Sequence, residues 1–150
     1  MKNLPEIKDI EQFKFDDASS YDSYADDYHH YIDKLCEPFA KQMVNLAHLQ
    51  PWHRVLDVGT GTGIIANYAA RLIDNSVSVF GIDLSEGMLK KSILNAKKLS
   101  ITNVQFHHMD AENLELPSES FDSVISMYAI DHFPNAAQAL KEMHRVLKPG

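Results

Sequence analysis

The chain has 150 residues, of which 45% are hydrophobic and 23% are charged, and these proportions are ordinary for a soluble globular domain. Its net charge of −7 argues against a nucleic-acid partner, because proteins that bind a polyanion need a basic surface. Cys36 is the only cysteine, which excludes an intrachain disulfide and is compatible with a reducing, cytoplasmic location. We expect no signal peptide and no membrane span, because no apolar run approaches the roughly 18 residues that a spanning helix requires.

The N-terminal third is predicted to contain a leader and a helical segment. Residues 1–20 are charged, and we expect them to form a flexible leader. Between residues 21 and 50, apolar residues recur at spacings of three and four, which predicts a helix with one apolar face. Pro38 lies inside this run and should kink the helix or begin a second one. Tyrosines crowd the start of the segment, so their rings either pack on the domain or form a lid in which Tyr21 or Tyr28 touches a ligand.

Residues 51–150 alternate between strand-like and helix-like patterns. Apolar runs rich in β-formers predict strands at residues 54–58, 77–82, 103–108 and 121–128. Apolar residues at helical spacing predict three helices, with core faces at Ile65, Tyr68, Ala69 and Leu72, at Leu89, Ile93, Ala96 and Leu99, and at Ala136, Leu140, Met143 and Leu147. Ser85 and Asn135 are expected to cap the second and third helices. This alternation predicts an α/β fold with a mostly parallel sheet and helices on both faces.

The segment from Val55 to Ile64, with the sequence VLDVGTGTGI, organises the predicted site. An apolar strand containing Asp57 runs into a turn with Gly59, Gly61 and Gly63, and then into a helix. Glycine accepts positive φ angles and lets a ligand approach the backbone, while the first N–H groups of the helix point toward that ligand. In an open α/β sheet, this crevice at the carboxyl ends of the strands is where ligands bind.

The spacing of the other motifs restricts the chemical class of the predicted ligand. A dinucleotide fingerprint requires a third glycine at the position of Ile64, and the turn also lacks the Gly-Lys-Ser/Thr of a phosphate loop. Asp83 ends the second strand, 20 residues beyond Gly63, where a carboxylate can accept hydrogen bonds from ribose hydroxyls. Asp110 and Ala111 follow the third strand, where a carboxylate and a backbone N–H suit the edge of an adenine. The predicted ligand therefore contains a ribose and needs no pyrophosphate cradle.

Five segments together resemble the class I S-adenosylmethionine-dependent methyltransferases, and in particular the group that includes ubiquinone- and menaquinone-biosynthesis methyltransferases. They are VLDVGTGTG, GIDLSEGML, Asp110-Ala111, FDSVIS and ALKEMHRVLKPG, and the resemblance extends from about Tyr21 to Gly150. It implies a Rossmann-like three-layer αβα sandwich, with an N-terminal helical lid at residues 21–50 and a cofactor-binding core at residues 51–150. It also implies S-adenosylmethionine as cofactor, S-adenosylhomocysteine as product, and methyl transfer to a small-molecule acceptor by in-line displacement.

The resemblance assigns a part of the cofactor to each candidate residue. The residues that would surround the methionine part are Gly59, Gly61 and Gly63, with Asp57 orienting the loop or the amino group and Ser126 lying near that amino group. The residues that would hold the nucleoside are Asp83 at the ribose, Leu84 and Met88 beside the adenine, and Asp110 and Ala111 at the adenine edge.

The three carboxylates also have structural alternatives. Asp57 could cap the turn, Asp83 could hold the helix that begins at Ser85, and Asp110 could form a loop turn. The residues alone leave both interpretations open for each of them.

His132 follows the fourth strand and is the candidate catalytic residue. Because the methyl donor is a sulfonium, the protein would mainly position the reactants and exclude water. A general base is required only if the acceptor must lose a proton, and a histidine can take that proton near neutral pH. The alternative for His132 is a hydrogen-bonded loop histidine. We predict no metal site, because the neighbours in the pairs His29-His30 and His107-His108 point apart.

In the resembled family a fifth strand and an antiparallel hairpin follow the position of Gly150, so we expect the C-terminal strands to be missing from this chain. The fourth strand would then have an open edge, which predicts self-association or a partner chain that covers it. Three other functions remain as alternatives. They are a non-catalytic cofactor-binding or partner-binding module, a nicotinamide oxidoreductase, which Ile64 disfavours, and a nucleic-acid methyltransferase, which the acidic charge disfavours.

Overall fold

The centre of the fold is a four-stranded parallel sheet in the order β3-β2-β1-β4, seen in a computed structural model that describes residues 9–150. The strands are β1 (Val55–Val58), β2 (Val79–Asp83), β3 (Val104–His108) and β4 (Ser123–Ile125). Val55 pairs with Val79 on one side and with Ser123 on the other. Because all strands run in the same direction, their carboxyl ends meet at one edge of the sheet.

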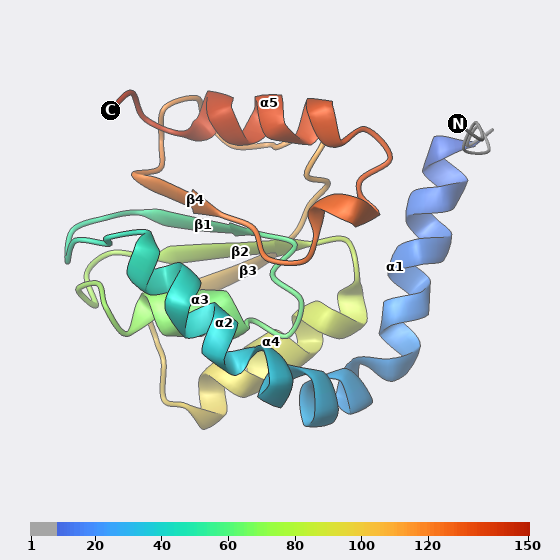
Figure 1. Cartoon of the computed structure of the whole chain (residues 1–150), viewed down its shortest axis with the longest axis horizontal. Coiled ribbons are helices and arrows are strands. Elements are labelled where there is room, and N and C mark those ends of the chain that lie inside the picture. Colours follow the sequence, from blue (N-terminus) through green and yellow to red (C-terminus); the bar gives the residue numbers. More distant parts are fainter. Residues whose placement is uncertain (1–8) are drawn as a thin grey trace.

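Helices cover both faces of this sheet (Figure 1). One face carries α2 (Asp33–Leu46), α3 (Ile64–Ala70) and α4 (Glu86–Lys98), and the other carries α5 (Ala136–Val146). The three-layer α/β architecture expected from the alternating pattern is confirmed. Ser85 accepts a hydrogen bond from the Met88 N–H and Asn135 accepts one from the Gln138 N–H, so both predicted helix caps are present.

Strand β1 joins two hydrophobic cores because its side chains alternate between the faces of the sheet. Val55 packs with α2 and α3 in one cluster, which includes Val44 and Ile65. Leu56 and Val58 pack in the other cluster, which includes Phe121 and the α5 residues Ala139, Met143 and Val146. Both cores therefore fix the strand that leads into the glycine turn.

The predicted core faces of all three helices were partly wrong. Leu72 is 49% exposed and lies beyond the end of α3. Ile93 is 53% exposed, Leu99 is 47% exposed and Leu140 is 51% exposed, whereas the polar Ser92 and Asn95 are buried in α4. The Ser92 hydroxyl donates to the Leu89 carbonyl, and the Asn95 amide donates to the Thr62 carbonyl. These small side chains face the glycine turn and let α4 approach it closely. The buried amide oxygen of Asn95 has no hydrogen-bond partner within the described residues.

The expected flexible leader is corrected by helix α1 (Ile10–Asp27), which includes residues 10–20. The Asp9 carboxylate accepts from the Gln12 N–H, so the helix begins with a side-chain cap. Residues 1–8 of the predicted leader lie outside the described residues. The helix departs from regular geometry at Tyr24 and continues through the π-helical turn η1 (Tyr28–Ile32) into α2, so the irregularity precedes Pro38, which lies inside α2.

Helix α1 stands across the edge at which the strands end (Figure 1). Just before β4, Phe121 forms a parallel bridge with Leu147, and its carbonyl accepts from the Lys148 N–H. Within residues 9–150, strand β4 itself pairs only with β1, and self-association through its other edge stays a prediction. No helix in this described part of the chain is both long and apolar enough to cross a bilayer.

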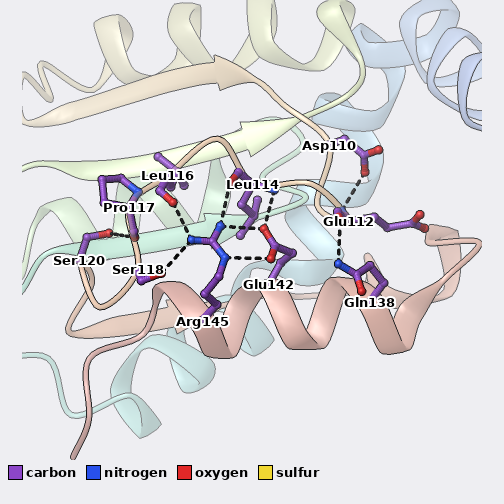
Figure 2. A network of polar contacts seen from close by, with 10 residues as sticks. All are labelled: Asp110, Glu112, Leu114, Leu116, Pro117, Ser118, Ser120, Gln138, Glu142 and Arg145. Atoms are coloured by element: carbon purple, nitrogen blue, oxygen red, sulfur yellow. Dashed lines mark hydrogen bonds and ion pairs between the residues drawn. The ribbon is translucent and has the colours of Figure 1, made fainter.

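The loop between β3 and β4 is fastened to α5 by Arg145 (Figure 2). Its guanidinium donates to the carbonyls of Leu114 and Leu116 and forms a two-pronged contact with Glu142. Glu142 in turn accepts from the Leu114 N–H at 3.0 Å. One side chain thereby satisfies backbone groups that would otherwise lose their partners.

Replacing Arg145 by Met should therefore destabilise the fold. We expect Arg145→Met to lower the free energy of unfolding by about 2–4 kcal/mol, since several charge-assisted hydrogen bonds are lost together. Urea unfolding at an unchanged m-value measures this loss. Arg71→Met is the matched control, because its guanidinium lies over the Tyr68 ring and should contribute only about 0.5 kcal/mol. Equal urea midpoints for the two variants would contradict this stabilising role of Arg145.

Candidate functional site

A cleft opens at the carboxyl edge of the sheet, beneath α1. It encloses about 810 Å³, part of it open to solvent, and the loops that follow all four strands line it together with α1 and η1. A smaller recess of about 380 Å³ continues along the glycine turn and shares Tyr28, Gly59 and Gly61 with the cleft. The site therefore lies where the parallel sheet predicts it.

Most of the predicted site residues come together in this cleft. Those that line it are Tyr21, Tyr28, Gly59, Gly61, Asp83, Leu84, Met88, Asp110, Ala111 and His132. Asp57 lines the smaller recess, whereas Gly63 and Ser126 line neither space. The Ser126 hydroxyl donates to the Val58 carbonyl at 2.8 Å and so supports the end of β1. The predicted cofactor contacts of Gly63 and Ser126 remain expectations.

The three glycines of the turn serve different purposes. All have positive φ angles, at 70° for Gly59, 53° for Gly61 and 83° for Gly63. A Cβ on Gly59 would lie 2.3 Å from the Cβ of Ala129, so this glycine allows the loop after β4 to approach. A Cβ on Gly63 would crowd the Ser92 and Phe106 side chains, so this glycine allows α4 to pack. A Cβ on Gly61 would meet nothing within 4 Å, and this glycine therefore faces open space in the cleft.

Asp57 is a buried carboxylate that holds the turn from below. Its side chain accepts from the Thr60 hydroxyl at 2.7 Å and from the Ala66 N–H of α3 at 3.1 Å. Burial raises the pKa of Asp57 to about 7, and the hydrogen bonds from Thr60 and Ala66 lower it only in part. These contacts match the structural alternative for Asp57, since both of its partners belong to the turn and to α3.

Asp83 ties the glycine turn to the next loop. One carboxylate oxygen accepts from the Gly61 N–H at 2.8 Å, and the other accepts from the Ser85 N–H at 2.9 Å. Burial raises the pKa of Asp83, against the opposing effect of these backbone hydrogen bonds. Each oxygen retains a lone pair, so the carboxylate at the floor of the cleft can still accept from ligand hydroxyls.

Lys14, which the sequence analysis did not identify, reaches from α1 to the loop after β3. Its ammonium lies 2.7 Å from Asp110 Oδ2 and 2.8 Å from Glu112 Oε2. Burial alone would lower the pKa of Lys14, but the hydrogen bonds to Asp110 and Glu112 raise it above its ordinary value. The end of the cleft predicted to hold an adenine thus contains two carboxylates and one cation.

His132 is held by two side chains of α1. Its Nε2 lies 3.0 Å from the Tyr21 hydroxyl, and its Nδ1 lies 3.3 Å from Asp17 Oδ2. A carboxylate can only accept, so the neutral ring that satisfies both contacts donates from Nδ1 to Asp17 and accepts at Nε2 from Tyr21. An Asp–His–Tyr arrangement of this kind can receive a proton and disperse the resulting charge.

Further polar contacts fasten α1 beside the cleft. Asp22 accepts from the Ser85 hydroxyl at 2.6 Å and from the Gly87 N–H at 2.7 Å, at the start of α4. Asp26 pairs with Lys91 at 2.5 Å. Sequence reasoning missed the α1 residues Lys14 and Asp17 because it placed them in a leader. The spacing of Asp9 and Gln12, which matches a helix capping box, is the signal that would have found the helix.

Both tyrosines considered for a lid lie at the cleft. Their rings meet edge to face with centroids 6.1 Å apart. Burial raises the pKa of Tyr28 to about 12, so its hydroxyl stays protonated and can donate at neutral pH. The cleft therefore combines aromatic walls, hydroxyl donors and carboxylate acceptors, which suit a neutral ring system bearing a sugar. Within residues 9–150 no group of three or more His, Cys, Asp or Glu side chains is placed to hold a metal ion.

A comparison with protein families matches the part of the chain that contains all four strands. A family model described as "Methyltransferase domain" matches residues 55–150. The chain is 37% identical over 117 residues to a demethylmenaquinone methyltransferase of Listeria welshimeri, which covers 78% of this chain and 50% of that protein. The chain thus spans about half the length of the curated relatives that it matches.

Solved structures with the same fold include proteins of different activity. A SAM-dependent methyltransferase from Aquifex aeolicus superimposes with a TM-score of 0.67 at 25% identity, covering 73% of this chain and 58% of that chain. The [4+2]-cyclase SpnF superimposes with a TM-score of 0.70 at 30% identity, covering 76% of this chain and 42% of that chain.

The raised pKa of Asp57 predicts how stability changes with pH. Because the folded protein keeps this proton to about pH 7 and the unfolded chain loses it near its ordinary pKa of 3.8, Asp57 makes the fold less stable as pH rises between these values. Asp57→Asn cannot ionise. Its free energy of unfolding should therefore rise relative to the original chain through this window, by at most about 1.4 kcal/mol per pH unit.

Urea unfolding of both proteins at several pH values from 4 to 8 measures this difference. A difference that stays constant across the window would contradict the raised pKa of Asp57. The Asp74→Asn variant, which removes an exposed carboxylate after α3, serves as the control.

Proposed function

This chain belongs to the class I S-adenosylmethionine-dependent methyltransferases, and we propose that it transfers the methyl group of S-adenosylmethionine to a small-molecule acceptor. The observation that carries the proposal is the Asp83 carboxylate, which lies at the floor of the cleft between the glycine turn and α4. The residues present fit the cofactor, because Gly61 leaves open space beside that carboxylate and Asp110 lies further along the same cleft.

The proposed placement of the cofactor follows the polar groups. Asp83 would accept hydrogen bonds from the ribose hydroxyls, and Asp110 would accept from the exocyclic amine of the adenine. Met88 lines the same part of the cleft and offers an apolar, polarizable wall for the base. The methionine part would extend along the glycine turn toward the recess that contains Asp33 and Thr62.

Asp83→Ala should abolish cofactor binding. It removes the ribose acceptor and also leaves the Gly61 and Ser85 N–H groups without their carboxylate partner. We expect affinity for S-adenosylhomocysteine to fall by at least about 100-fold in calorimetry, since hydrogen bonds to a charged group contribute ~1.5–3 kcal/mol each. Asp74→Ala is the control and should bind normally. Unchanged affinity in a folded Asp83→Ala protein would refute the placement.

The reaction chemistry then depends on position and on one proton. When bound, the cofactor supplies an electrophilic methyl group on a sulfonium centre. The glycine turn and the loop after β4 would hold the acceptor in line with that group, while α1 limits the access of water. Where the acceptor must lose a proton, the Tyr21 oxygen would receive it and pass its own proton to His132 Nε2. Asp17 would stabilise the resulting imidazolium.

His132→Gln tests this role. We expect kcat for an acceptor that must be deprotonated to fall by about 10²–10⁴-fold, because general-base catalysis contributes roughly that factor. Affinity for S-adenosylhomocysteine should stay within about threefold of the original value, since His132 does not reach the cofactor in this proposal. His144→Gln, on the exposed side of α5, is the matched control. Full activity of His132→Gln would contradict a role as general base and would mean that His132 serves only to hold α1.

The acceptor is proposed from the relatives. The protein of Listeria welshimeri is named for demethylmenaquinone, so a demethylated quinone is the first acceptor to assay. The net charge of −7 favours such a small molecule over a nucleic acid. Because the chain spans about half of these relatives, the assay needs the cofactor-binding measurement beside it.

The second candidate is a module that binds the cofactor and transfers no methyl group. SpnF favours keeping it, because that protein shares the fold and is described as a [4+2]-cyclase. Binding of S-adenosylhomocysteine together with no turnover on any acceptor would select this candidate.

A further inference from the structure

Lys14 is the cation at the end of the cleft where the adenine would lie. Its side chain is only 11% exposed, and its ammonium contacts Asp110 and Glu112 at 2.7 and 2.8 Å. A lysine this buried is stable only when paired, so these contacts fix where the side chain lies. The oxygen that Lys14 contacts is Oδ2 of Asp110, a residue that lines the cleft and is proposed to bind the exocyclic amine.

The two carboxylates also accept hydrogen bonds from backbone N–H groups, which fix their positions. Asp110 Oδ1 accepts from the Glu112 N–H at 2.8 Å, and Glu112 Oε1 accepts from the Asn135 N–H at 2.7 Å. Gln138 donates to the Glu112 carbonyl, so α5 also fixes the backbone of this loop (Figure 2). Oδ1 of Asp110 is thus engaged in the loop turn, and Oδ2 is the oxygen left for any incoming donor.

We infer that Lys14 competes with the adenine amine for Asp110 Oδ2, and that it thereby sets how strongly the site selects adenine. This inference rests on the proposed function, because it concerns the same cofactor. Lys14 sits on a long flexible stem and has Glu112 as a second partner, so it can release Asp110 and remain paired. Adenine must therefore either displace the ammonium from Oδ2 or share that oxygen with it, and in both cases its hydrogen bond is weaker than one to an unpaired carboxylate.

Removing the ammonium should then strengthen binding, and only for a base that donates a hydrogen bond at this position. Hypoxanthine carries a carbonyl where adenine carries the amine, so S-inosylhomocysteine offers Asp110 no donor at that position. Lys14→Met keeps the apolar stem and removes the charge. It frees Asp110 Oδ2 for adenine and gives hypoxanthine no comparable gain.

The test is a thermodynamic cycle measured by calorimetry on the full chain, with S-adenosylhomocysteine and S-inosylhomocysteine as ligands. Both ligands lack the sulfonium charge of S-adenosylmethionine. A change in the local electrostatic field therefore affects the binding of both ligands equally. Lys14→Met should bind S-adenosylhomocysteine about 3–10-fold more tightly than the original chain. It should bind S-inosylhomocysteine no more tightly, because the Lys14 ammonium can donate to the hypoxanthine carbonyl. Lys14→Arg retains the charge and should therefore show no gain in affinity for S-adenosylhomocysteine.

Lys90→Met is the matched control, because Lys90 belongs to an exposed ion pair with Glu86 on α4. Weaker or unchanged binding of S-adenosylhomocysteine by Lys14→Met would overturn the inference, and so would an equal gain for both ligands. Thermal unfolding of each variant separates these outcomes from misfolding. If the original chain binds neither ligand, the proposed function fails; if it binds them and the cycle shows no coupling, only the competition fails.

Discussion

The hydrogen bonds that the Asp83 carboxylate accepts are the contacts on which the rest of the site depends. One joins the turn after β1, through the Gly61 N–H, and the other joins the start of α4, through the Ser85 N–H. A single side chain thereby fixes two loops that arise from neighbouring parallel strands. Asp57 supports the same turn from inside, through Thr60 and Ala66. The geometry of the floor is therefore set before any ligand arrives, which is the condition for selective binding.

Helix α1, which forms the wall of the cleft above this floor, is attached by a different kind of contact. Helix α1 contributes little to the buried core, with Ala25 as its buried residue, and it is held to the cleft by polar side chains. Lys14, Asp17 and Asp22 each contact a loop that follows a different strand. The contacts of Asp22 lie at the surface and weaken with salt, whereas those of Lys14 and of the floor are buried and are screened less. The site thus joins a rigid base to a wall whose attachment depends on charge.

The sequence predicted the floor of the cleft, which the loops after the strands form, better than its wall, which α1 forms. The difference has physical reasons. A buried strand followed by glycines has few conformational solutions, so the sheet, the helix caps and the cleft position of Asp83 and Asp110 followed from local patterns. Helix α1 has no such apolar stripe, and its position depends on pairs such as Lys14 and Asp110, which are 96 residues apart. The burial of Ser92 and Asn95 likewise depends on the glycine turn that α4 meets, which periodicity within α4 does not reveal.

The attachment of α1 to the loops after β2, β3 and β4 has a kinetic consequence. Helix α1 lines the cleft through Lys14, Asp17 and Tyr21, so a ligand that fills the cleft enters and leaves beside this helix. An obstacle common to both directions slows association and dissociation by the same factor and leaves the equilibrium constant unchanged. Loosening the helix, by salt or by substitution of Asp22, would accordingly hasten exchange of spent for fresh cofactor. Wherever this exchange is slower than methyl transfer, the movement of α1 would set the turnover rate.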